Sequence, residues 1–408
     1  SRLLKASIAS ILSVGMVSGA QAANWLLLQG TENPKAPDHR FWGFVQPQYT
    51  YHDPDPISGI TGPGPKLPTA NGKVVAQNLV GPELEDEEAL HVKRARFGWR
   101  GRINDKIDYF TLFEIANNAL TYEPFGDRAM AIAPSDLSLT FKHIDGAKIR
   151  AGLFKNPGSE ESFQGIPNFD YIEFTDFQNR VNLERFATGA SNLAASTQGN
   201  IGTPTNEGYG FSAFRDWGVQ VFDSFKNDKW DLSYAVKLGR GEYLYETDDV
   251  DFHPELYLYA SAEYDLPGGK KAKKHGLKFY AWHQDGERSF ESDPNEEKFD
   301  RIRQGVGFKV LGKLFDLGLK QRVQAEFMHA EGMIFTAPQT NTIGDNNFMQ
   351  YAVDDGNKAR GYYLDLGLYL DKNWEISYRY DRNDLLYETA SNINPGNERE
   401  ITGHTLGV

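Results

Sequence analysis

The chain has 408 residues, contains no cysteine and carries a formal net charge of −13. The absence of cysteine excludes disulfides, zinc–thiolate sites and thiol catalysis. The acidic balance argues against nucleic acid as a partner, and we expect none.

Residues 1–22 show the three parts of a secretory signal peptide. A basic start is followed by an apolar run from Ala6 to Val17 and by Ala20-Gln21-Ala22, the small-residue pattern of a cleavage site. The run is shorter than the roughly 20 residues that a membrane-spanning helix needs. We therefore predict cleavage after Ala22, and we expect residues 23–39 to form a short periplasmic N-terminal segment.

From residue 40 onward, apolar and polar residues alternate with a period of two in many separate segments. This period indicates antiparallel β-strands with one apolar and one polar face. The predicted strands are 40–51, 89–102, 106–117, 135–143, 147–155, 215–225, 229–240, 254–265, 275–285, 300–313, 315–331, 360–370, 373–386 and 400–408. We predict one all-β domain over residues 40–408, a transmembrane antiparallel β-barrel.

The predicted connections alternate between tight polar turns and long loops rich in Gly, Pro, Asn and Asp. Short periplasmic turns and long extracellular loops are typical of outer-membrane barrels, which usually have an even number of strands. Fourteen predicted strands, the last one truncated, suggest about 16 strands in the full protein, with about 30–40 residues beyond Val408. The third loop, from about Asn156 to Phe214, is the longest, and we expect it to fold into the lumen and narrow it.

An arginine column stands out in the second predicted strand. Because side chains alternate across a strand, Arg94, Arg96, Arg100 and Arg102 share one face, while the opposite face is apolar. Guanidinium groups backed by apolar residues suit a wall with lipid on one side and a water-filled lumen on the other. Arginine stays charged and offers paired donors to an oxyanion, so the column predicts a path that favours anions.

Several segments, in order and spacing, resemble the phosphate-selective porin family, the anion-specific porins of Gram-negative outer membranes. The segments are 93–101, 135–140, 151–161, 215–218, 360–363 and 377–381. The resemblance implies a sixteen-stranded trimeric barrel with an arginine ladder, a lysine cluster and a third loop inside the lumen. The arginine column fits the ladder, whereas the lysines lie scattered over separate strands, which leaves phosphate specificity open.

We predict a passive outer-membrane channel that favours anions, with phosphate or similar oxyanions as its solutes. Twelve residues are candidate lumen cations: Arg94, Arg96, Arg100, Arg102, Lys142, Lys148, Arg150, Arg301, Arg303, Lys309, Arg322 and Arg379. The expected partners are small anions, outer-membrane lipid, lipopolysaccharide and two further copies of the chain. Alternatively, many of these cations pair with carboxylates across strands and only stiffen the wall.

Two other functions stay open at this point. One is a general diffusion porin of the same fold, and the other is a non-conducting barrel that sheathes a partner such as a cytochrome. We expect neither an enzyme nor a cofactor, because no nucleophile elbow, phosphate-binding loop or metal-ligand spacing of histidines appears in the sequence.

Overall fold

A computed structural model describes residues 24–51, 88–116, 121, 131–182, 214–241, 254–268, 275–288, 298–315, 317–335, 351–352, 356–388 and 400–408. Its main feature is a 14-stranded antiparallel sheet in which each strand pairs with its neighbours in the sequence, apart from the short strands β12 and β13. The predicted signal peptide, residues 1–22, lies outside the described residues.

The strands are close to those expected from the alternation. They are β1 (His39–Tyr51), β2 (Glu88–Asn104), β3 (Ile107–Glu114), β4 (Ala133–Phe141), β5 (Lys148–Lys155), β6 (Arg215–Asn227), β7 (Trp230–Gly239), β8 (Glu255–Asp265), β9 (Gly276–Arg288), β10 (Phe299–Gly312), β11 (Lys320–Gly332), β14 (Lys358–Tyr369), β15 (Glu375–Glu388) and β16 (Glu400–Gly407). Ile334–Phe335 (β12) and Tyr351–Ala352 (β13) form a separate small ladder. The predicted fold class, an antiparallel all-β barrel wall, is confirmed.

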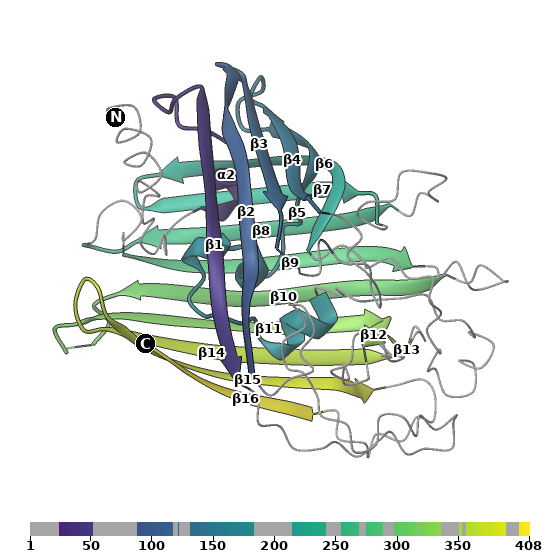
Figure 1. Cartoon of the computed structure of the whole chain (residues 1–408), viewed down its shortest axis with the longest axis vertical. Helices are drawn as coiled ribbons and strands as arrows, with labels where there is room; N and C mark the ends of the chain where they lie inside the picture. Colours follow the sequence, from purple (N-terminus) through teal and green to yellow (C-terminus); the bar gives the residue numbers. More distant parts are fainter. Residues whose placement is uncertain are drawn as a thin grey trace.

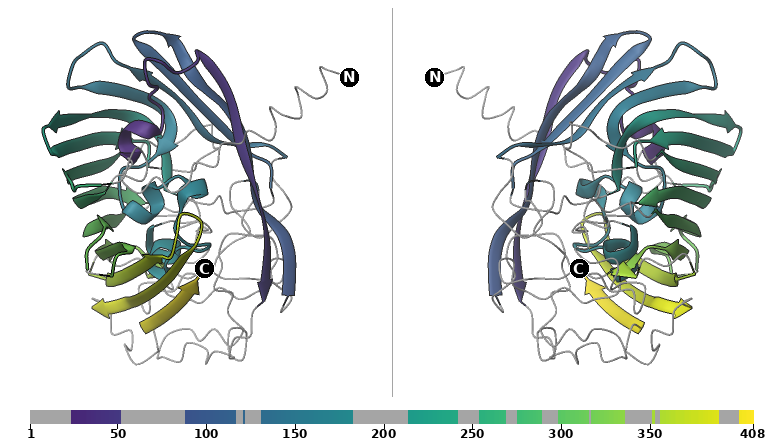
Figure 2. Two further views of the ribbon diagram at one scale, coloured as in Figure 1. Left: turned by 90° about the vertical axis from the view of Figure 1, so that its left-hand side faces the viewer. Right: turned by 90° about the vertical axis from the view of Figure 1, so that its right-hand side faces the viewer.

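The sheet curves strongly, with β1 and β16 at its two edges, and the helical segments lie on its concave side (Figures 1 and 2). These segments are α2 (Trp25–Leu28), α3 (Glu160–Phe163), the 3₁₀ turn Ile166–Asn168 and the π-helical turn Gln178–Asn182. The last three belong to the third loop, so the described part of that loop folds inward as predicted. No helix among the described residues has the length and hydropathy needed to cross a membrane.

The two faces of the sheet have the opposite chemistry to those of a soluble protein. Large apolar side chains are exposed along the convex face, among them Val45, Leu139, Val236, Phe327, Leu364 and Leu366. Charged side chains fill the concave side, including Arg96, Glu114, Arg150, Glu326 and Arg379, each at most 7% exposed. Soluble proteins rarely bury charge on this scale or expose a continuous apolar face, whereas a barrel in lipid has such an outer surface.

One register shift changes which side chains reach the concave side. β1 and β2 pair regularly except at Gln46/Pro47, where Gln46 lies opposite Arg94 and Pro47 lies opposite Val92. The intervening Lys93 is the extra residue of a β-bulge, at a point where Pro47 has no N–H to donate to the ladder. Lys93 is fully buried beside Arg94, a placement that strict alternation does not predict.

Candidate functional site: the concave face of the sheet

Most of the candidate lumen cations pair with acidic side chains. Nine of the twelve form ion pairs with described carboxylates: Arg96, Arg100, Arg102, Lys142, Lys148, Arg301, Lys309, Arg322 and Arg379. Arg96, for example, holds Glu114 of β3 at 2.7 Å, and Arg379 holds Asp365 of β14 at 2.9 Å. Several of these pairs link strands and stiffen the wall, as the sequence alternative proposed. Arg100 and Arg102 instead pair with residues that precede β1, and Lys309 pairs with Asp170 of the third loop.

Arg94, Arg150 and Arg303 use neutral partners in the contacts that the structure defines. Arg94 donates to the Gln46 side-chain oxygen at 2.8 Å. Arg303 donates to four backbone carbonyls, among them Val181 of the third loop at 2.9 Å. Arg150 donates to the Thr140 hydroxyl and to the Leu26 carbonyl, both at 3.2 Å, and lies 4.4 Å from the centroid of the Phe222 ring.

Two lysines outside the predicted set have the same kind of environment. The Lys155 ammonium donates to the carbonyls of Ser162 and Gln164 at 2.8 and 2.5 Å. The Lys237 ammonium donates to the Asp216 and Phe154 carbonyls and to the Asn156 side chain, at 2.7 to 3.1 Å. Both are at most 5% exposed.

We call Arg94, Arg150, Lys155 and Lys237 the basic wall, because they lie on β2, β5 and β7 at one side of the curved sheet. Within the described part of the chain, none of the four forms an ion pair with a carboxylate. Arg215 adds to the same region, 3.2 Å from Asp136 and 4.7 Å from the Phe214 ring. Cations that lack a carboxylate in direct contact leave a more positive local potential than ion-paired ones do, and such a potential favours anions.

The third loop crosses the concave side and is attached to strands far apart in the sheet. On one side its Glu160 pairs with Lys278 of β9 at 2.6 Å. On another its Glu173 side chain pairs with Lys93 of β2, while the Glu173 carbonyl accepts from Arg379 of β15 at 3.0 Å. The described half of the loop is therefore positioned to narrow the lumen.

Glu326 of β11 is the main anchor for the start of this loop. Its carboxylate accepts hydrogen bonds from the Ser159 hydroxyl, the Tyr280 and Tyr363 hydroxyls and the Trp282 ring N–H, at 2.7 to 3.0 Å. Four donors converge on one buried carboxylate, so a full set of charge-assisted hydrogen bonds offsets its desolvation.

The second anchor is Glu161, which belongs to the loop itself. Glu161 sits 3.2 Å from Arg379 and accepts from the Thr175 backbone and hydroxyl, both at 2.7 Å. Burial raises the pKa of the Glu161 carboxyl to about 8, although Arg379 and the Thr175 hydrogen bonds oppose the shift. The charge at this point of the loop therefore changes within the neutral pH range.

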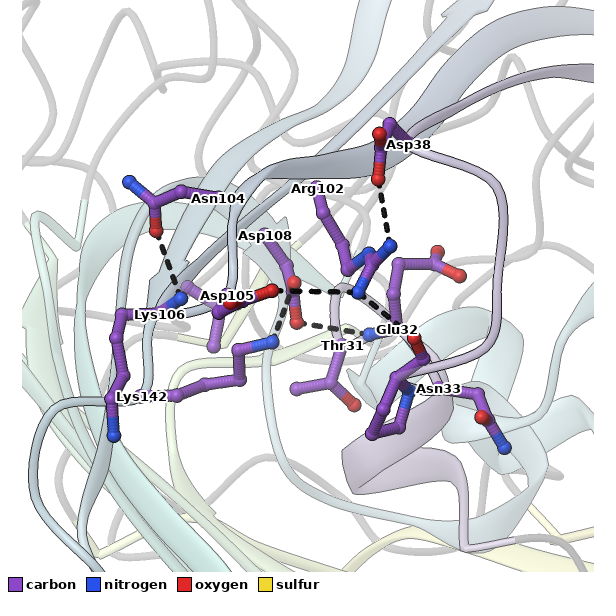
Figure 3. A network of polar contacts seen from close by, with 12 residues as sticks. Thr31, Glu32, Asn33, Asp38, Arg102, Asn104, Asp105, Lys106, Asp108 and Lys142 are labelled. Carbon is purple, nitrogen blue, oxygen red and sulfur yellow. Dashed lines mark hydrogen bonds and ion pairs between the residues drawn. The ribbon is translucent and has the colours of Figure 1, made fainter.

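The N-terminal segment contacts the end of the arginine column that lies next to the turn between β2 and β3, where Figure 3 shows Arg102 beside Asp38. Arg100 donates to the Leu28 and Thr31 carbonyls and pairs with Glu32. Arg102 donates to the Pro34 carbonyl at 2.9 Å and pairs with Asp38 at 2.7 Å. Residues 24–38, part of the N-terminal segment predicted over residues 23–39, pack against side chains of the concave face, and the periplasmic placement of the segment stays a prediction.

The sequence thus placed the arginine column on the correct face but missed three contributors to the site. Lys93 was hidden by the β-bulge, and Lys155 and Lys237 were single lysines on separate strands. The signal that could have found the lysines is their position on the polar face of alternating strands. Nothing in the local pattern indicates that the N-terminal segment packs on the concave face, since its partners Arg100 and Arg102 lie about 70 residues away in the sequence.

Comparison with known proteins finds a likeness to solved structures at low sequence identity. No known family profile and no curated protein sequence matches the chain. The outer-membrane channel DcaP of Acinetobacter baumannii aligns with a TM-score of 0.46 and 11% identity, over 93% of this chain and 88% of that one. An anion-selective porin from Comamonas acidovorans aligns with a TM-score of 0.38 and 12% identity, over 86% and 93%. Salmonella typhi OmpF, in a complex with daunomycin, aligns with a TM-score of 0.36 and 12% identity, over 80% and 93%.

Proposed function

We propose that this protein is a porin of the bacterial outer membrane, forming a passive aqueous channel that favours anions. The observation that carries the proposal is the reversed polarity of the sheet, with exposed apolar side chains on its convex face and buried charges on its concave face. This arrangement suits a barrel with lipid outside and a polar lumen inside.

The anion preference rests on the distribution of charge within the lumen. Acidic residues of the wall, the third loop and the N-terminal segment neutralise nine of the predicted cations, whereas the basic wall keeps neutral partners. An anion moving past the basic wall exchanges water for guanidinium and ammonium donors. Carbonyl and amide oxygens already accept from these donors and compete with the anion for them, so the anion is released again, as conduction requires.

Phosphate or a similar oxyanion is the solute class we favour. Arg94 and Arg150 provide the planar donor pairs that match oxyanion geometry, and Lys155 and Lys237 add point charges. The family resemblance implies a lysine cluster, and Lys155 and Lys237 are our candidates for it. Assembly as a homotrimer and contact with lipopolysaccharide remain predictions from the resemblance.

Reversal potentials of the purified protein in planar bilayers under a KCl gradient test the channel. We expect the potential to lie toward the chloride equilibrium, and inorganic phosphate added to the bath should reduce the chloride current by competing for the basic wall. A reversal potential on the potassium side would contradict the anion preference, and a complete lack of conductance would contradict the channel.

The extensive pairing of the lumen cations favours one alternative, a general diffusion porin of the same fold. A pore whose charges are mostly compensated selects by size more than by charge. The same bilayer measurement separates the two functions, because a general porin gives a reversal potential close to zero and a chloride current that phosphate leaves unchanged.

A further inference from the structure

The N-terminal segment, Asn24–Asp38, is attached to three separate parts of the concave side. Its Asn24 amide donates to the Ser233 hydroxyl of β7 at 2.7 Å. Its Gln29 amide donates to the Phe163 carbonyl of the third loop at 2.6 Å. Its Glu32 N–H donates to Asp108 of β3 at 2.9 Å, and Asp108 in turn holds Lys142 at 2.7 Å. The segment therefore lies across the lumen side of the wall between β2 and β7.

What holds this segment to β2 and β5 is a set of oxygen acceptors facing arginines. The Glu32 carboxylate, whose side chain is 4% exposed, bridges Arg100 and Arg40, with the Arg40 contact at 3.2 Å. Backbone carbonyls of the segment also accept hydrogen bonds from Arg100, Arg102 and Arg150. Each of these contacts is of the kind that an oxyanion makes with arginine.

The glycine in the middle of the segment allows this close approach. Gly30 has φ of +101°, a backbone conformation that side chains rarely adopt, and a Cβ placed there would lie 3.0 to 3.3 Å from the Arg150 guanidinium. The segment thus lies directly against an arginine of the basic wall.

We propose that Asn24–Asp38 is an internal plug, in which Glu32 occupies an oxyanion site formed by Arg40 and Arg100, and that oxyanions in the lumen compete with Glu32 and release the segment. The proposal rests on the proposed function only in treating the lumen as an aqueous path for anions. Release exposes Arg100, Arg102 and Arg150 together, which extends the cationic path from the basic wall to the turn between β2 and β3.

Thiol labelling tests release without requiring a current. The chain has no cysteine, so Leu26→Cys and Leu28→Cys each introduce a single thiol in α2. Within the segment, Leu26 is packed into the buried cluster and is 1% exposed, whereas Leu28 is 43% exposed and serves as the matched control. In the full chain in detergent, inorganic phosphate should raise the maleimide labelling rate of Leu26→Cys about tenfold over chloride at equal ionic strength. The reason is that phosphate replaces the Glu32 carboxylate as the acceptor of charge-assisted hydrogen bonds from the arginines. The rate at Leu28→Cys should not change.

The variant Glu32→Gln provides the second arm, because it keeps the size of the side chain and removes its charge. Combined with Leu26→Cys, it should raise the maleimide labelling rate in the absence of phosphate, and the further increase caused by phosphate should be smaller. Without the cysteine, Glu32→Gln should raise the anion-to-cation permeability ratio about two- to tenfold, because the loss of one negative charge makes the potential along the path more positive. Glu388→Gln is the control, because Glu388 pairs with Lys358 away from the concave side, 3.1 Å apart.

A labelling rate at Leu26→Cys that is independent of both phosphate and Glu32 would overturn the plug. Unchanged permeability in Glu32→Gln would show that Glu32 does not face the path, which also contradicts the proposal. If no variant conducts but labelling responds to phosphate, the channel function fails and the oxyanion-released plug stands.

Discussion

At the scale of single residues, the concave face contains cations of two kinds. Most are neutralised by a nearby carboxylate, as Arg96 is by Glu114. A few donate hydrogen bonds to neutral oxygens instead, as Arg94 does to the Gln46 side chain. A paired cation contributes mainly to the rigidity of the wall, whereas an uncompensated one changes the potential that a permeating ion experiences.

Arg94→Gln tests this distinction. We expect the anion-to-cation permeability ratio to fall about two- to fivefold, because the substitution removes a positive charge that faces the lumen. Reversal potentials in planar bilayers measure the change. Arg382→Gln is the control, since Arg382 pairs with Glu400 in an exposed position, and an equal effect in both variants would show that the position of the charge is irrelevant.

Glu161 predicts a pH dependence of selectivity. Because burial raises the pKa of this carboxyl to about 8, acidification from pH 9 to pH 7 adds a proton and removes a negative charge beside Arg379 and Asp365. The anion preference should therefore increase as the pH falls. Reversal potentials over this pH range should show the change in the native protein and lose it in Glu161→Gln. A pH response that survives the substitution would assign the titration to another group.

The raised pKa of Glu161 also determines how the stability of the folded protein changes with pH. The folded-state pKa of Glu161 lies above its ordinary value of 4.5, so between these values the folded state binds more protons than the unfolded state does. The contribution of Glu161 to stability is complete below pH 4.5 and is lost as the pH rises through about 8.

At the scale of elements, the third loop and the N-terminal segment matter more to the lumen than any single strand. Both lie on the concave side (Figure 2), and both are held by hydrogen bonds and ion pairs. Apolar contacts add to the attachment, since Trp25 of α2 and Phe163 of the loop belong to one buried cluster. The two segments are also linked directly through Gln29 and the Phe163 carbonyl.

Glu326→Gln tests how the third loop is held. The amide keeps the size of the carboxylate but places an N–H group toward hydroxyl and ring N–H donors, which we expect to cost about 1–3 kcal/mol. Thermal unfolding in detergent should shift to lower temperature, and single-channel currents should become noisier as the loop loosens. Glu331→Gln on the same strand is the control, because the partly exposed Glu331 contacts only His329 among the ion pairs of the described residues. Equal unfolding temperatures for the two variants would contradict the role of Glu326 as anchor.

At the scale of the whole molecule, the reversed polarity of the sheet determines where the protein is stable. The convex face exposes large apolar side chains on successive strands, and its burial in lipid removes them from water. On the concave side, the third loop and the N-terminal segment supply hydrogen-bond partners to buried charges. Their apolar side chains also form one buried cluster with residues of the strands.

Leu366→Lys tests the lipid-facing surface. A lysine near the middle of the outer face should cost about 2–4 kcal/mol, whereas one near the interface should cost about 0–1 kcal/mol. The yield of folded protein in lipid vesicles should therefore fall for Leu366→Lys and change little for Leu317→Lys, at an exposed position in the turn before β11. Equal yields for the two variants would contradict the assignment of the convex face to lipid.

The sequence by itself determined the strands, their antiparallel order and the face on which Arg94, Arg96, Arg100 and Arg102 lie, because alternation is a local property with a period of two. It also indicated that the third loop folds inward. Only the tertiary structure decided which cations lie against a carboxylate. Glu32 pairs with Arg100 and Glu161 pairs with Arg379, and the partners of each pair are far apart in the chain. The bulge at Lys93 and the placement of residues 24–38 depend in the same way on contacts that no local pattern records.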